Sequence, residues 1–136
     1  MNLDDSLAYN ETFKPVRKHA KISVRNPQKN ANQVVFYTVC AYDRSGAFEC
    51  QRRFSEFERL REAWRRRIPG LYLPFLPPKK IFGNTEKLHL EERAFLLEQF
   101  LLKVSKISYL SGSDEFHLFA RYDSLAGPPG LLKMLD

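Results

Sequence analysis

The sequence predicts an α+β fold, in which a three-stranded antiparallel sheet packs against a helical subdomain that contains a proline-rich loop. The segments with strand patterning all precede the segments with helical patterning. Four of the eight prolines fall within residues 69–82, between the first two main helices. Strands followed by helices favour segregated layers over alternating βαβ winding. The 136 residues, 43% of them hydrophobic, are enough for one domain with its own core.

The three predicted strands follow one another along the first half of the chain. Residues 21–25 alternate polar and apolar side chains and stop at Asn26-Pro27, which predicts a short strand and a turn. Residues 34–42 are rich in β-branched and aromatic residues on both faces, as in a central strand. Turn-forming residues at 43–46 lead into a third strand over residues 47–54. The pattern predicts a three-stranded meander.

The only two cysteines lie in the predicted hairpin. A three-residue turn centred on Ser45 would place Cys40 opposite Cys50, so a cross-strand disulfide is conceivable. No secretory signal precedes them, and the cell interior keeps thiols reduced. We therefore expect two reduced, small apolar residues on one face of the sheet.

Three helices are predicted after the strands. Ser55 and Glu58 have the spacing of a capping box, and apolar residues at helical spacing follow until Pro69-Gly70. A longer helix is expected from about 88 to about 104. Ser113 is placed to cap a last short helix.

The domain organisation and the charge are uneven along the chain. We expect a flexible arm over residues 1–13, a folded domain over 14–122 and a tail or linker over 123–136. The formal net charge is +6, and residues 14–82 carry sixteen basic against five acidic side chains. An anionic partner is expected: a nucleic acid, an acidic protein or a phospholipid surface. No apolar run approaches the 20 or so residues that span a bilayer, so contact with a membrane would be peripheral.

The sequence does not predict an enzyme. Its three histidines lie in three different segments, and its six glycines are scattered. No nucleophile, metal-ligand or phosphate-cradling motif is present. We therefore expect no catalytic residue, no metal and no cofactor.

Two adjacent arginines and an aromatic residue mark the junction between the third strand and the first helix. Arginine binds phosphate through two parallel hydrogen bonds, and an aromatic face can stack on a ring. Arg52, Arg53 and Phe54 therefore suit a phosphorylated ring as ligand. The alternative is a solvated strand end without a ligand.

The proline-rich loop carries a second set of candidates. Residues 74–80 end in Lys79 and Lys80, and Ile81 and Phe82 follow directly. Adjacent apolar residues beside a lysine pair in a loop are suited to insertion into a membrane surface. Arg93, early in the second predicted helix, is a further candidate for ligand binding. The alternative is that Arg93 only forms an ordinary exposed ion pair.

Three motifs in order identify a family. They are Arg-Arg-Phe-Ser-Glu-Phe-Glu-Arg-Leu at 52–60, Pro-x-x-Pro-Pro-Lys-Lys at 74–80 and Glu-Glu-Arg-x-x-x-Leu-Glu-Gln-Phe-Leu at 91–101. With the strand before them, they resemble the phox-homology (PX) domain found in sorting nexins, over roughly residues 15–122. The resemblance implies the fold predicted above and a phosphoinositide-binding module, most often for phosphatidylinositol 3-phosphate. It implies a cytoplasmic protein, peripheral on endosomal membranes, with a role in sorting and trafficking.

The resemblance also implies roles for single residues. Arg53 looks like the arginine that holds the 3-phosphate, and Phe54 like the aromatic residue that stacks under the inositol ring. Lys79 looks like the lysine that contacts the 1-phosphate. Arg93 looks like the arginine that hydrogen-bonds the free ring hydroxyls.

Further contacts are implied around these four. Arg52 and Lys80 are possible additional lipid contacts. Ile81 and Phe82 fall in the segment that resembles the membrane-inserting loop of the family.

Other readings of the same features remain open. The loop over 74–80 also fits a proline-rich ligand that a protein domain with an aromatic groove could bind. Arg65–Arg67 and the wider basic field would suit a nucleic acid, although no nucleic-acid motif is present and none is expected as a partner. The same run could be a solvated helix end or a second contact for anionic lipid.

Overall fold

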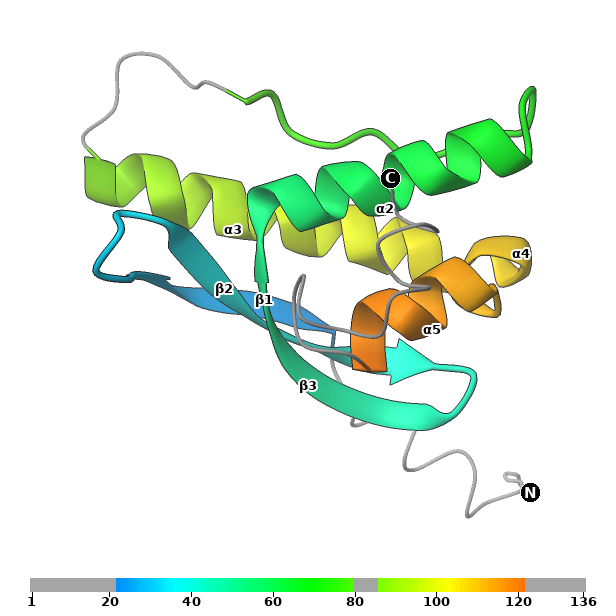
Figure 1. Ribbon diagram of the computed structural model, residues 1–136, viewed down its shortest axis with the longest axis horizontal. Helices are drawn as coiled ribbons and strands as arrows, with labels where there is room; N and C mark the ends of the chain where they lie inside the picture. The colour runs from blue at the N-terminus through cyan, green and yellow to red at the C-terminus, as the bar shows by residue number, and fades with distance from the viewer. Residues whose placement is uncertain (1–21, 80–85, 122–136) are drawn as a thin grey trace, which may run out of the picture.

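The sheet and the helices form two layers in the computed structural model, which describes residues 22–79 and 86–121. The antiparallel sheet has the strand order β1-β2-β3, and the helices lie together on one side of it (Figure 1). The predicted α+β class is confirmed. The predicted arm at 1–13 and tail at 123–136 lie outside the described residues. The elements are β1 (Ser23–Lys29), β2 (Val35–Asp43), β3 (Gly46–Arg53), α2 (Phe54–Arg67), α3 (Glu86–Ser105), α4 (Ser108–Ser111) and α5 (Asp114–Arg121).

The first strand continues beyond the turn predicted at Asn26-Pro27. Its pairing with β2 shifts between Arg25 and Gln28, and Asn26 has a φ of 55°. A bulge of this kind accommodates a proline within an edge strand, because the edge does not need every backbone N–H. The prediction that the strand ends at residue 25 was therefore wrong.

The hairpin between β2 and β3 is tighter than predicted. Asp43 pairs with Gly46, so Val39 lies opposite Cys50 and Cys40 lies opposite Glu49. A shift of one residue in the pairing moves a side chain to the other face of the sheet. The two cysteines are free and lie on opposite faces, so the prediction that they share a face was wrong.

The corner between β3 and α2 is held by a contact that the sequence did not predict. The backbone N–H of Arg53 donates to Oε1 of Glu56 at 2.9 Å, and Glu56 is buried. The helix starts at Phe54, so the predicted capping box of Ser55 and Glu58 was wrong. The strand therefore runs into the helix without a linker, which fixes where Arg53 and Phe54 lie.

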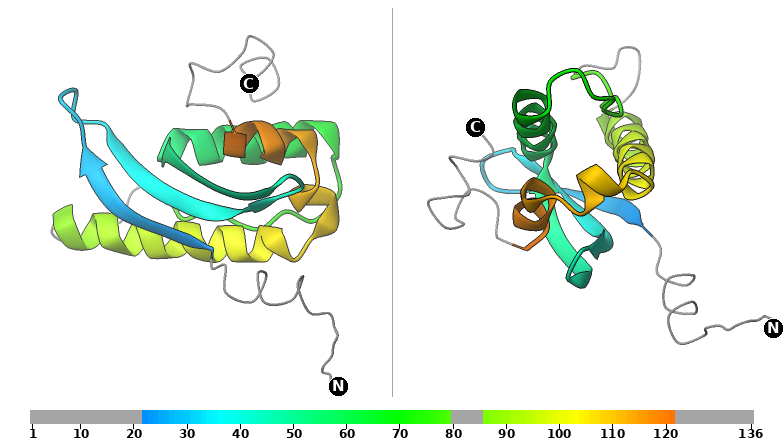
Figure 2. Two further views of the ribbon diagram at one scale, coloured as in Figure 1. Left: turned by 90° about the horizontal axis from the view of Figure 1, so that it is seen from below. Right: turned by 90° about the vertical axis from the view of Figure 1, so that its right-hand side faces the viewer.

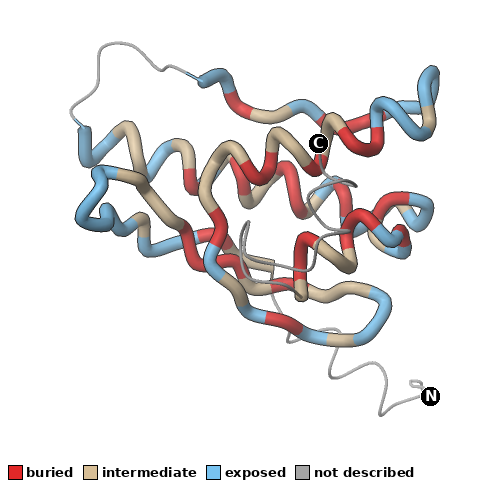
Figure 3. Tube along the Cα trace, viewed as in Figure 1, coloured by how far each residue is buried: buried red, intermediate tan, exposed pale blue. Residues whose placement is uncertain are grey.

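The core lies between the inner face of the sheet and the helices (Figure 3). Ser113 joins two of its parts: its Oγ accepts the indole N–H of Trp64 at 2.9 Å and the backbone N–H of Phe116 at 3.1 Å. The second bond confirms Ser113 as the cap of the last helix. The largest side chains of the core are Trp64, Tyr37, Phe57, Phe100 and Phe119.

The loop between α2 and α3 packs closely along α2 as far as the structure describes it. The guanidinium of Arg61 donates from Nε to the carbonyl oxygen of Pro74 at 2.7 Å. Leu73, Pro74 and Pro77 are buried. This part of the loop is a fixed extended segment. Of the helices described, none is long and apolar enough to span a membrane.

Candidate functional site

A pocket of about 280 Å³ lies where the β3–α2 corner, the proline-rich loop and α3 meet. Three parts of the chain that are distant in sequence supply its positively charged side chains: Arg53 at the corner, Lys79 in the loop and Arg93 in α3. Phe54 adds an aromatic ring. The four residues for which the resemblance implies headgroup contacts are thus brought together in one cavity. Its full lining is Gln33, Val34, Val35, Tyr37, Arg53, Phe54, Ser55, Glu58, Lys79, Leu90 and Arg93.

Arg93 connects the parts of this pocket. Its guanidinium lies over the ring of Phe54, with Cζ 4.3 Å from the ring centroid, within the range of a cation–π contact. Its Nη2 donates to the carbonyl oxygen of Pro78 at 3.2 Å and to that of Lys79. The Arg93 side chain therefore fixes the loop relative to the aromatic ring. Its role is more than that of one partner in an ordinary exposed ion pair.

Tyr37 also lines this pocket and is not among the site residues that the sequence predicts. Its side chain is buried, 1% exposed, and forms a hydrogen bond with Arg93. Burial raises the pKa of Tyr37, and the charge and hydrogen bond of Arg93 oppose that rise without cancelling it. The phenol is neutral at physiological pH. An aromatic residue in a central strand is normally core, so no sequence signal marked this one.

The pocket is net positive. Its three cations face a single carboxylate among the lining residues, that of Glu58, whose Oε1 is 4.0 Å from Nζ of Lys79. This pair is weak because the side chain of Lys79 is 77% exposed. Arg53 pairs with no carboxylate in the described part of the chain. The arrangement suits a small ligand with more than one negative charge.

Arg52 does not line the pocket. It is 2% exposed, and its Nε donates to the carbonyl oxygen of Phe119 at 2.7 Å. Its guanidinium also lies over the Phe119 ring, 5.5 Å from the centroid. Alternation along β3 sends Arg52 into the core and Arg53 out of it. The prediction of Arg52 as an additional lipid contact is therefore corrected: it joins α5 to the sheet.

The other predicted residues lie elsewhere. Lys80, Ile81 and Phe82 are outside the described residues. Arg65–Arg67 form the last turn of α2, away from the pocket at its first turn. Arg65 donates to Glu62 at 2.8 Å and lowers the pKa of that carboxyl, and Arg67 pairs with Glu115.

One of the alternative readings, a proline-rich ligand for a protein domain, finds no support in the geometry. Pro74 and Pro77 are buried, so the loop does not present its proline motif to an aromatic groove. Among the described residues, no cluster of three or more histidine, cysteine or acidic side chains could hold a metal.

Comparison with known proteins gives consistent matches. A family model described as PX domain matches residues 41–123. Sorting nexin-17 of Pongo abelii is 34% identical over 77 residues, which cover 57% of this chain and 16% of that protein. Sorting nexin MVP1 of Saccharomyces cerevisiae is 36% identical over 89 residues, 63% of this chain and 17% of the relative. Sorting nexin-10A of Danio rerio is 30% identical over 113 residues, 76% of this chain and 49% of the relative.

The chain thus spans half or less of the length of each of these relatives. A solved structure, the X-ray structure of a designed CISK-PX domain, superimposes with a TM-score of 0.63 at 25% identity. The match covers 74% of this chain and 98% of that one.

Proposed function

The chain belongs to the PX domain family, whose members are phosphoinositide-binding modules of membrane trafficking, and from that premise we propose that it binds phosphatidylinositol 3-phosphate. Through this lipid the protein attaches to the cytoplasmic face of endosomal membranes as a peripheral protein. It acts there in sorting as a binding module without catalysis.

The observation that carries the proposal is the convergence of Arg53, Phe54, Lys79 and Arg93 on one net-positive pocket. In the proposed complex, the guanidinium of Arg53 binds the 3-phosphate through two parallel hydrogen bonds. The ring of Phe54 packs against the inositol ring. Lys79, at the open side of the pocket, pairs with the phosphodiester that leads to the acyl chains.

Arg93 supplies selectivity in this proposal. Its guanidinium is held over the Phe54 ring in the pocket lining, and in the proposed complex a hydroxyl of the inositol ring accepts a hydrogen bond from it. A phosphate in place of the hydroxyl would need room that the contact between Arg93 and Phe54 restricts.

The membrane adds weaker, less specific contributions. Each lysine near an anionic leaflet contributes about 1 kcal/mol to the free energy of membrane binding. The lysines concerned are Lys79, which lines the pocket, and Lys80, which follows it in sequence. We propose that Ile81 and Phe82 insert between the lipids, each contributing at most about 2–3 kcal/mol. Stable attachment then needs the headgroup, the anionic surface and the insertion together.

Vesicle binding by Arg53→Gln tests the headgroup site, with Arg25→Gln as the matched control because Arg25 is an exposed arginine outside the pocket. Wild type and control are expected to sediment with vesicles that contain phosphatidylinositol 3-phosphate, and Arg53→Gln is expected to stay in solution. Vesicles with the 4-phosphate, the 4,5-bisphosphate or no phosphoinositide test selectivity. Equal sedimentation of Arg53→Gln and wild type would refute the site, and equal binding to every vesicle would refute the selectivity.

A double change, Ile81→Ser with Phe82→Ser, tests insertion separately. It is expected to weaken vesicle binding and to leave binding of a soluble short-chain phosphatidylinositol 3-phosphate unchanged. Equal loss of both would contradict insertion.

A further inference from the structure

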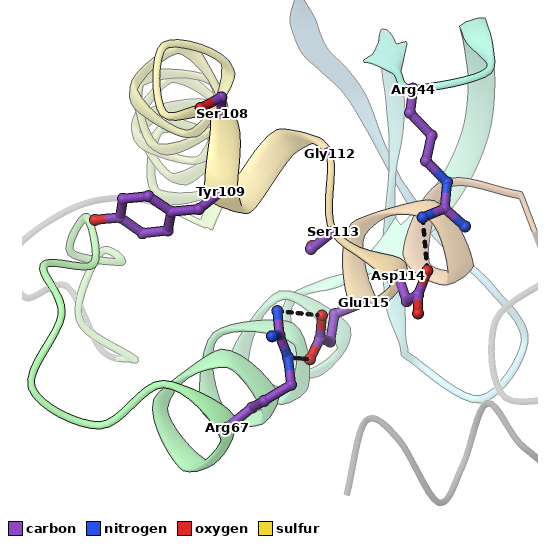
Figure 4. A pocket seen from close by; sticks show the side chains of 8 residues that line it. All are labelled: Arg44, Arg67, Ser108, Tyr109, Gly112, Ser113, Asp114 and Glu115. Carbon is purple, nitrogen blue, oxygen red and sulfur yellow. Dashed lines mark hydrogen bonds and ion pairs between the residues drawn. The ribbon is translucent and has the colours of Figure 1, made fainter.

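A second pocket, of about 370 Å³, is drawn in Figure 4. It lies at the opposite end of α2 from the first pocket. It is formed by the last turn of α2, by α4 and by the start of α5. A helix of 14 residues is about 21 Å long, so the two pockets are separated by the length of α2. A ligand in the first pocket leaves the second one open.

Two arginines in the wall of this second pocket keep hydrogen-bond donors available. Arg67 uses Nε and Nη2 to bind the buried carboxylate of Glu115, and its third nitrogen points away from that pair (Figure 4). Arg44 donates from Nη1 to Asp114 at 2.6 Å. Both side chains are about half exposed, 51% and 46%. Each guanidinium is held in place by one carboxylate of the protein. Its remaining N–H groups can donate to a second carboxylate that belongs to a partner.

Exposed apolar side chains lie on the loop after α2 and on α4, at the same end of the molecule. Leu71 is 50% exposed, Tyr72 57% and Tyr109 44%. The hydroxyl of Tyr109, in the pocket lining, donates to the backbone carbonyl of Tyr72 at 3.1 Å, so the loop and α4 form one surface. In the end-on view of Figure 2, both α4 and the loop that follows α2 face the viewer, at one end of the molecule.

The backbone that presents these side chains is fixed. Arg61 binds the carbonyl oxygens of Leu73 and Pro74, at 3.5 and 2.7 Å, and Leu73 is buried. Exposed aromatic residues on a fixed backbone lose little conformational entropy when a partner covers them. Such residues dominate the energy of protein interfaces.

We propose that this end of the molecule, formed by Arg44, Arg67, Leu71, Tyr72 and Tyr109, docks a peptide segment of a partner protein in which acidic residues stand next to aromatic or aliphatic ones. The acidic side chain pairs with the free donors of Arg44 and Arg67, and the apolar side chain packs on Leu71 and Tyr72. Four further exposed cations lie at the ends of α2 and α3, and two of them, Arg65 and Arg66, share the carboxylate of Glu62; the other two are Lys103 and Lys106.

This surface is distant from the proposed headgroup site. The length of α2 separates the two, so a headgroup in the first pocket does not cover Arg44 or Arg67. The surface therefore stays accessible while the lipid is bound, and one molecule can hold a membrane and a protein at the same time.

Selection from a displayed library of random twelve-residue peptides against the full chain tests the proposal. Enriched peptides are expected to share one or two acidic residues beside an aromatic or aliphatic residue. The double variant Leu71→Ser with Tyr72→Ser is expected to bind the best peptide about tenfold more weakly, and Arg44→Gln severalfold more weakly with a reduced salt dependence. Phe95→Ser is the matched control, since Phe95 is as exposed as Tyr72 but lies within α3 and outside the proposed docking surface.

Changes in the amide chemical shifts of the protein show where the peptide binds. On addition of the peptide, the resonances of residues 71–73 and 108–115 are expected to move, while those of Arg53 and Arg93 stay. The proposal is overturned by a library that yields no shared pattern, by a basic or proline-rich pattern, or by binding that the double variant does not weaken. Vesicles of anionic phospholipid without phosphoinositide give the remaining outcome: binding that depends on Leu71 and Tyr72 would assign this surface to a membrane.

Discussion

The guanidinium of Arg93 lies 4.3 Å from the ring centroid of Phe54, although one residue belongs to α3 and the other begins α2. The same guanidinium binds the carbonyl oxygens of Pro78 and Lys79. A single side chain thus sets the width of the pocket and the position of the loop beside it.

Arg93→Lys is expected to weaken binding to vesicles with phosphatidylinositol 3-phosphate by about tenfold, because lysine keeps the charge but loses the planar fork that stacks and donates twice. Selectivity over the 4-phosphate is expected to fall as well. Sedimentation with the two kinds of vesicle measures both effects. Lys87→Arg, a matched exchange on an exposed residue of α3 outside the pocket, serves as control. Unchanged affinity and selectivity in Arg93→Lys would contradict the role of the guanidinium.

Tyr37→Phe removes only the hydroxyl that is hydrogen-bonded to Arg93. The ring stays in the core, so the free energy of unfolding is expected to fall by only about 1 kcal/mol. Binding of the lipid headgroup is expected to weaken severalfold, because Arg93 loses one of the contacts that orient it. Urea denaturation and titration with a soluble short-chain lipid measure the two quantities. A loss of stability with unchanged binding would show that Tyr37 is only a core residue.

Arg52→Met and Arg53→Gln are expected to have opposite effects. The first leaves the carbonyl oxygen of Phe119 without its buried donor, so the free energy of unfolding should fall by about 2 kcal/mol or more while the folded protein binds vesicles normally. The second should abolish binding and change stability by less than about 0.5 kcal/mol. Thermal unfolding and vesicle sedimentation on both variants decide this. Loss of vesicle binding in the folded Arg52→Met variant would show that Arg52 contributes to the lipid-binding site.

The hairpin at Asp43 is expected to make stability depend on pH. The side chain of Asp43 is buried, and it accepts hydrogen bonds from Arg121, from the backbone N–H of Ser45 and from His117. Burial alone would raise the pKa of Asp43, but these bonds and the charge of Arg121 together hold it below its usual value. Since the folded pKa is the lower one, the carboxylate stabilises the fold above about pH 4 and loses that effect as the pH falls further.

Asp43→Asn separates this contribution from other carboxylates. Wild type is expected to be more stable than the variant at neutral pH, and the difference should shrink as the pH falls below about 4. Urea denaturation at several pH values measures it. A difference that stays constant over this range would contradict the assignment to Asp43.

The pattern of the chain predicted much of the fold, and the misses have definite causes. The order of strands and helices, the cap at Ser113 and the class of fold followed from periodicity and local chemistry, which depend on neighbours in sequence. The register of the hairpin did not, because Asp43-Arg44-Ser45-Gly46 is compatible with a two-residue or a three-residue turn. One residue of difference moved Cys40 and Cys50 to opposite faces.

The candidate binding site, like the fold, was predicted from the sequence only in part. Residue type and spacing, together with the resemblance they carry, singled out Arg53, Phe54, Lys79 and Arg93, since a guanidinium beside an aromatic ring is visible in a sequence. The difference between Arg52 and Arg53 depends on which way a strand faces in the assembled core, and the contact of Tyr37 with Arg93 joins two elements far apart in the chain. The sequence by itself determined which side chains could bind an anionic ring. Only the tertiary structure decided which of them share a cavity, because that depends on how the sheet, the loop and α3 pack against one another.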